Sequence, residues 1–291
     1  MRGIRGLRGH PGGAHRRRLR PAAEVVSGGV TRRPLIGLVI PAAIAVLFIA
    51  VPLIGLLAHV DWSTLPAQLV STDVLTALRL SLECSIIAVA ISLVVGVPLA
   101  YLLARSSLPG RRVIRGLVTL PLVLPPVVGG IALQTALGTT TPIGGVLQHF
   151  GIVLPFSTAG AAIAEAFVGF PFLVITLEAG LRQRDEHFEE VAATLGARPW
   201  RRFWRVTIPL AAPSIAAGAA LCWARALGEF GATITFAGSY PGTTETLPIA
   251  AYSSFEGSGD VGTAITLSLV LLTISIVVLV VLRDRWLGAL R

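Results

Sequence analysis

Long apolar runs alternate with short polar segments along most of this 291-residue chain. A helix needs about 20 apolar residues to cross the hydrocarbon core of a bilayer. Six runs approach that length, and they lie at residues 35–58, 81–104, 116–137, 159–181, 210–236 and 262–282. The third and the fifth runs are less uniform than the others. The pattern predicts an all-α integral membrane protein with six transmembrane helices.

The distribution of positive charge sets the orientation of these helices. If the amino terminus lies inside the cell, the inside segments hold 22 of the 24 basic residues, all of them arginine; these segments are 1–34, 105–115, 182–209 and 283–291. Inside loops of membrane proteins carry an excess of arginine and lysine. The opposite orientation would place nearly all of this charge outside. We therefore expect a multi-pass protein of the cell membrane with both termini in the cytoplasm.

The predicted helices divide the chain into four regions. Residues 1–34 contain nine arginines without apolar periodicity, so we expect a disordered cytoplasmic tail that sets topology, or else one that binds a specific partner. Residues 35–75 hold the first transmembrane helix and an external loop, and residues 76–282 hold the main transmembrane domain. Residues 283–291 form a cytoplasmic end. Topology explains the basic charge without nucleic acid as a partner.

The composition offers no obvious means of covalent chemistry. Only 13% of the residues are charged, against roughly 25% in soluble domains. The five histidines are scattered without metal-ligand spacing, and the chain has no phosphate-binding glycine loop and no nucleophile elbow. We expect a transport subunit rather than an enzyme, with no cofactor or metal of its own and with energy supplied by another subunit.

The polar segment 182–209 is dense in charge between two long apolar runs. Asp185 is a plausible N-cap of a short helix, and Gly196 suits the left-handed position that ends one. One helical face is apolar, formed by Phe188, Val191, Ala192 and Leu195. A second short helix beginning at Pro199 would be rich in aromatic and arginine side chains. The first helix is acidic, which favours a protein partner over the membrane surface or packing on its own chain.

The segment resembles the EAA loop of permease subunits of bacterial ABC importers. The matching positions are Glu190, Ala192, Gly196 and Pro209, while Val191, Val206 and Ile208 are conservative replacements. The resemblance implies the type I ABC importer permease fold. It also implies that the loop seats in a cytoplasmic ATPase subunit dimer, which hydrolyses ATP and moves two copies of the permease.

Two further segments are similar to molybdate importer permeases, a branch that includes sulfate permeases. They run from Leu120 to Gly130 and from Ala226 to Pro248. The resemblance implies import of molybdate, captured first by an extracytoplasmic binding protein. Sulfate or tungstate is the alternative cargo. The Pro-Pro-Val-Val-Gly-Gly and Thr-Ile-Thr-Phe runs favour molybdate.

Proline and charge mark a candidate transport pathway in the third and fifth runs. Pro125 and Pro126 remove backbone donors and break regular helix, which lipid-embedded backbone tolerates only in packed protein or beside a cavity. The alternative is a kink that merely fits neighbouring helices.

Arg225 and Glu229 stand four residues apart on one face of the fifth run, where an ion pair is expensive and commonly functional. The pair would line the pathway or lock the helix to a neighbour. Thr233 and Thr235 offer neutral hydroxyls for weak, transient contact with a tetrahedral anion.

A stand-alone secondary transporter or channel is the rival of another class. Such proteins often show internal repeats with broken helices in corresponding positions. The EAA-like loop occurs once in this chain, and the Pro-Pro break has no counterpart in the second half. A membrane-embedded enzyme ranks below both, because no predicted span contains a histidine.

Overall fold

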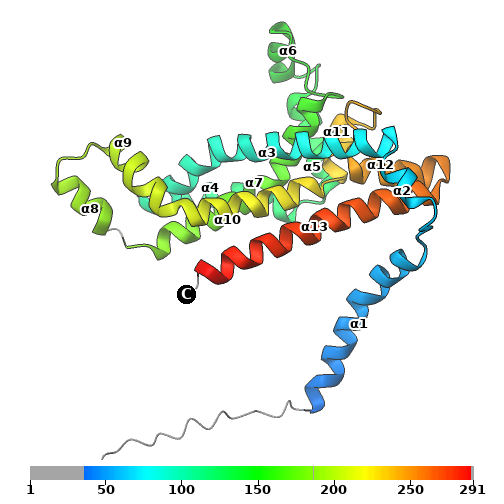
Figure 1. Cartoon of the computed structure of the whole chain (residues 1–291). Helices are drawn as coiled ribbons and strands as arrows, with labels where there is room; N and C mark the ends of the chain where they lie inside the picture. The colour runs from blue at the N-terminus through cyan, green and yellow to red at the C-terminus, as the bar shows by residue number, and fades with distance from the viewer. Residues whose placement is uncertain (1–35, 186, 290–291) are drawn as a thin grey trace, which may run out of the picture. The chain divides into compact units, whose positions relative to one another are not determined.

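The computed structural model describes residues 36–185 and 187–289, and this part of the chain is helical with connecting turns (Figure 1). The long helices are α1 (Ile36–Ala58), α3 (Thr72–Arg105), α7 (Thr158–Gln183), α10 (Ile208–Leu227) and α13 (Val261–Ala289). The shorter ones are α2 (Leu65–Leu69), α4 (Arg111–Val123), α5 (Pro126–Leu137), α6 (Pro142–His149), α8 (His187–Thr194), α9 (Pro199–Arg202), α11 (Gly231–Ala237) and α12 (Leu247–Ser253). Two π-helical turns occur, at Phe203–Thr207 and Ser254–Ser258.

Within the described residues, five helices are long and apolar enough to cross a membrane. The first, second, fourth and sixth predicted spans correspond to α1, α3, α7 and α13. The α3 helix begins at Thr72, nine residues before the predicted start, because the Ser71 hydroxyl caps it by accepting from the Val74 amide at 3.4 Å. The predicted tail 1–34 lies outside the described residues, and the orientation in the membrane stays a prediction.

Two predicted spans are not continuous helices. The third is divided into α4 and α5 by Leu124 and Pro125, whose backbones are extended, so the described residues do not contain six uninterrupted spans. Proline at 125 and 126 removes two backbone donors in succession, which prevents α4 from continuing. The fifth span ends at Leu227, and α11 restarts at Gly231 after a three-residue break. Both breaks fall in segments singled out for the candidate pathway.

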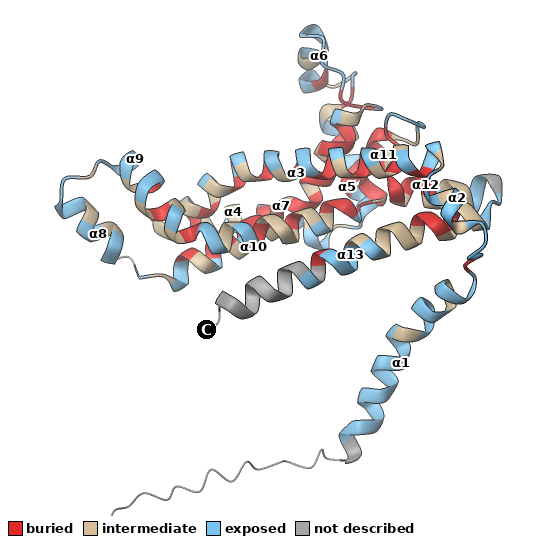
Figure 2. Cartoon of the chain, in the orientation of Figure 1, coloured by how far each residue is buried: buried red, intermediate tan, exposed pale blue. Residues whose placement is uncertain are grey.

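The core lies where α7 packs between α3 and α10. Figure 2 shows buried residues along α7, which contributes more buried residues than any other described helix. Small residues permit the close approach: a Cβ added at Gly169 would lie 2.9 Å from the Cys222 carbonyl oxygen of α10. Close backbone contact through small residues is how transmembrane helices associate without a hydrophobic driving force between them.

The described part of the chain separates into two compact units, with the boundary between Leu53 and Ile54. The helices from α2 to α13 all belong to the second unit, which therefore holds every candidate site residue. The predicted domain boundary near residue 75 stays a prediction.

Candidate functional site

The charged loop forms α8, a sharp turn and α9, as its local signals predict. The Asp185 carboxylate accepts from the His187 amide at 2.9 Å, next to the start of α8. At the other end Gly196 adopts φ +82°, and its amide donates to the Ala193 carbonyl at 2.9 Å. The Ala197 amide donates to the Ala192 carbonyl at 3.0 Å. These two bonds define a Schellman motif, in which glycine takes the left-handed position that ends the helix.

The apolar face of α8 is not covered by the described part of the chain. Phe188, Val191 and Leu195 are 58%, 41% and 83% exposed, and Ala192 is half-buried. Glu190 is exposed as well. A three-residue apolar stripe on an acidic helix is suited to a groove on a protein partner.

The second part of the loop differs from the separate helix that was expected. From Pro199 the chain runs through α9 and the π-helical turn straight into α10, and Pro209 lies at the start of α10. Phe203 is buried, and its ring meets Tyr101 of α3 edge-on with centroids 5.0 Å apart. The loop is therefore attached directly to the helix core.

A polar anchor joins α8 to the end of α3. The Glu189 carboxylate lies 3.7 Å from Arg105 Nε and accepts from the Tyr101 hydroxyl at 3.4 Å. Arg105 also donates through Nη2 to the Arg184 carbonyl at 3.1 Å. The side chains of Arg105 and Glu189 are only 8% and 16% exposed, so this ion pair is shielded from solvent. Sequence reasoning missed these roles because the partners are 84 residues apart.

We expect Glu189→Ala to loosen α8 from the core. Losing hydrogen bonds to a charged group costs roughly 1.5–3 kcal/mol, which increases local opening of α8 at least several-fold. Hydrogen–deuterium exchange of amides 187–194 should be faster in the variant. The exposed Glu190 gives a matched comparison, because Glu190→Ala removes the same charge without touching the anchor. Equal exchange in the two variants would contradict a role for Glu189 in holding α8.

The two helix breaks of the candidate pathway lie against each other. A Cβ added at Gly231 would be 2.7 Å from Pro126 Cβ, and one added at Gly130 would be 2.6 Å from Thr235 Cβ. Real Cβ atoms do not approach so closely, so α5 and α11 pack backbone to backbone at these glycines. Pro125 caps the start of α5 at this contact.

Arg225 and Glu229 form an ion pair at the break between α10 and α11. Arg225 Nη2 lies 2.5 Å from Glu229 Oε2. Glu229 Oε1 accepts from the Ala232 amide at 2.9 Å, so the same carboxylate holds the first turn of α11. The Glu229 side chain is 1% exposed while that of Arg225 is 31% exposed. The pair meets as expected, although Glu229 lies beyond the end of α10 rather than on its face.

The two threonines have different environments. The Thr235 hydroxyl donates to the Gly231 carbonyl of its own helix at 2.7 Å, and it is not a free donor. Thr233 is fully buried, and its hydroxyl has no hydrogen-bond partner among the described residues. Glu165 of α7 is 1% exposed, and one of its carboxylate oxygens lacks a partner in the described structure.

The fold and the loop define a membrane subunit of an importer, and comparisons give the family. Residues 96–289 match the family described as binding-protein-dependent transport system inner membrane component. The chain belongs to this family. It is a multi-pass membrane protein and a transport subunit, not an enzyme.

Individual relatives narrow the class. The chain is 45% identical to the molybdenum transport system permease protein ModB of Mycobacterium tuberculosis over 82% of its own length and 90% of the relative's. It is 40% identical to ModB of Escherichia coli K12 over 73% of its length and 92% of that protein's. The crystal structure of a bacterial ABC transporter that imports alginate matches with a TM-score of 0.66 and 19% identity, covering 86% of this chain and 93% of that one. This last likeness establishes the importer permease fold alone.

Proposed function

We propose that the chain is the transmembrane permease subunit of an ATP-driven molybdate importer. The observation that carries the proposal is the 45% identity to a molybdenum transport permease over 90% of that protein's length. The cargo is a tetrahedral dianion that passes from an extracytoplasmic binding protein to the cytoplasm. A neighbouring solved structure, that of the alginate transporter, contains such a substrate-loaded periplasmic protein.

In this proposal α8 couples the permease to ATP hydrolysis. The uncovered stripe of Phe188, Val191 and Leu195 seats in a groove of a cytoplasmic ATPase. Movement of the ATPase reaches the membrane through the Glu189–Arg105 anchor and the Phe203 ring contact with α3. The end of the bundle that carries α8 is then the cytoplasmic end, in agreement with the arginine distribution. ATP is bound by the partner, and this chain needs no cofactor.

In this proposal the transport pathway runs beside the point where the helix breaks before α5 and before α11 meet. Arg225 keeps a partly exposed guanidinium, but Glu229 neutralises it, so an oxyanion would be held weakly and released readily. Two copies of the chain would form the complete pathway and alternate between outward-open and inward-open states. High affinity then belongs to the binding protein.

Competition between anions tests the cargo. In cells that lack their own molybdate permease, uptake of radiolabelled molybdate should require this chain together with its ATPase and binding protein. Excess tungstate should block that uptake, because it has the same charge and tetrahedral shape and nearly the same size. Excess sulfate should not. Inhibition by sulfate with no effect of tungstate would reassign the permease to sulfate.

Co-purification separates this function from a stand-alone transporter or channel. A tagged chain should bring down an ATPase subunit, whereas the rival class predicts that none is retained.

A further inference from the structure

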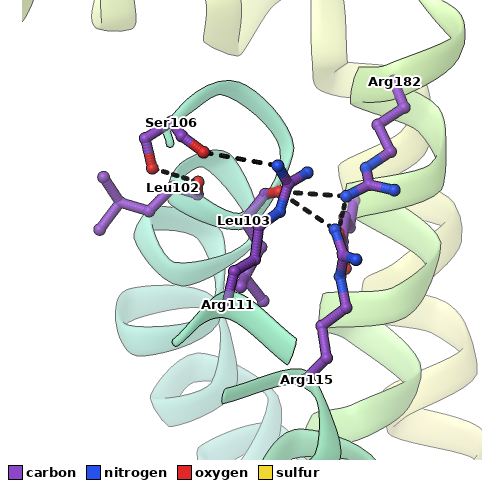
Figure 3. Close-up of polar contacts among 7 residues, drawn as sticks. Leu102, Leu103, Ser106, Arg111, Arg115 and Arg182 are labelled. Carbon is purple, nitrogen blue, oxygen red and sulfur yellow. Dashed lines mark hydrogen bonds and ion pairs between the residues drawn. The ribbon is translucent and has the colours of Figure 1, made fainter. Parts of the chain in front are cut away.

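An open cavity of about 570 Å³ lies at the end of the bundle where α3 and α7 finish and α4 begins. Its lining residues are Leu108, Gly110, Arg111, Arg112, Arg115 and Arg182. Four of the six are arginines, and none is acidic. Figure 3 shows the guanidinium groups of Arg111, Arg115 and Arg182 gathered in one space beside Leu103.

The positive charge in this cavity is only partly balanced. Glu178 binds Arg115 Nε at 2.8 Å and Nη2 at 2.6 Å, and its Oε1 also lies 2.8 Å from Arg182 Nη2. Arg111 and Arg112 have no carboxylate partner within the described residues. The four guanidinium groups of the lining and the one carboxylate that binds two of them together carry a net charge of +3.

Three of these arginines are held by hydrogen bonds to backbone carbonyls, while Arg112 is exposed. Arg115 and Arg182 both donate to the Leu103 carbonyl, at 3.5 and 3.3 Å. Arg111 donates to the Ser106 carbonyl at 3.5 Å, while its buried Nε has no hydrogen-bond partner in the described structure. Arginines that served only to orient the helices would not need to be held in fixed positions. Their arrangement is suited to a bound counter-anion.

The chemistry of the lining selects the class of anion. Guanidinium groups present forks of N–H donors that match the oxygens of phosphate-like groups. The α4 helix begins at the cavity, and its N-cap residue Gly110 has no side chain to cap it, so the helix dipole adds to the attraction. We propose that this cavity binds a tetrahedral oxyanion, either the phosphate of an anionic lipid headgroup or a free oxyanion such as phosphate or molybdate. The site is separate from the α5–α11 pathway and does not depend on the identity of the cargo.

The test compares two double variants of the full-length chain in lipid nanodiscs. Arg111→Gln with Arg112→Gln removes the two arginines that do not bind Glu178, so the ion pairs of the core remain. Arg201→Gln with Arg205→Gln removes the same charge from exposed positions on and just after α9 and serves as the matched control. Calorimetric titration with inorganic phosphate and with molybdate in zwitterionic lipid measures the free oxyanion. Native mass spectrometry in discs containing phosphatidylglycerol measures retained lipid.

We expect the cavity variant to lose about tenfold or more in affinity or lipid retention, while the control stays close to the unmodified chain. Loss in the calorimetric arm assigns an aqueous oxyanion, and loss in the lipid arm assigns a headgroup. Equal behaviour of the two variants would overturn the proposal, because charge alone would then explain the binding. Absence of binding in both arms would overturn it as well.

Discussion

Gly196→Pro abolishes ATP-driven uptake and leaves membrane insertion intact: this is the result expected from the turn that ends α8. Proline fixes φ near −65°, whereas Gly196 adopts +82°. The substitution also removes the amide that donates to the Ala193 carbonyl. The turn that ends α8 then cannot form, and the apolar stripe of α8 meets the ATPase at a different angle.

Gly196→Asn is the matched control for that experiment. Nothing lies within 4 Å of a Cβ added at Gly196, so bulk alone costs little there. Asparagine tolerates the left-handed conformation better than other non-glycine residues, and its variant should retain most of the uptake. Both variants are assayed in proteoliposomes with the ATPase and the binding protein. Uptake that survives the proline but is lost with the asparagine would refute a conformational role for Gly196.

Glu229→Ala should be the most damaging single change in the candidate pathway. It leaves the Arg225 charge without its partner and the first turn of α11 without the bond to the Ala232 amide. Breaking a buried ion pair by removing one partner costs about 3–5 kcal/mol. We expect a lower midpoint of thermal unfolding in detergent and loss of uptake.

The double variant Arg225→Met with Glu229→Gln separates charge from helix capping. It removes both charges together, while the glutamine oxygen still accepts from the Ala232 amide. Thermal stability should recover substantially relative to Glu229→Ala. If transport returns as well, the pair has a structural role; if stability returns without transport, the charges act in the pathway. Equal stability of the two variants would contradict the ion pair as the source of the loss.

Local signals in the sequence predicted most of this architecture, and tertiary contacts account for the rest. The start and end of α8 follow from Asp185 and Gly196, whose hydrogen bonds span only a few residues. The length of the apolar runs predicted α1, α7 and α13, because run length is also a local property of the sequence. The adjacent prolines at 125 and 126 predict a break, whereas the length of the apolar run predicts one continuous span.

The break after Leu227 carried a much weaker signal. Gly-Glu-Phe is not a strong stop sequence, and the restart of α11 depends on the Glu229 carboxylate bound to the Ala232 amide. The Arg105–Glu189 pair and the arginine cavity depend on residues that the fold brings together from distant positions. Neither periodicity nor motif spacing contains that information.

The backbone contact between α5 and α11 determines which parts of the candidate pathway are able to move. Gly130 meets Thr235, and Gly231 meets Pro126, without room for one further methyl group at either point. Close-packed interiors transmit displacement instead of absorbing it. The two half-helices must therefore swing as a single rigid body, with hinges at Leu124–Pro125 and at the three residues after Leu227. Gating in this protein would then be a rotation set by two short non-helical links, with no bending of either helix.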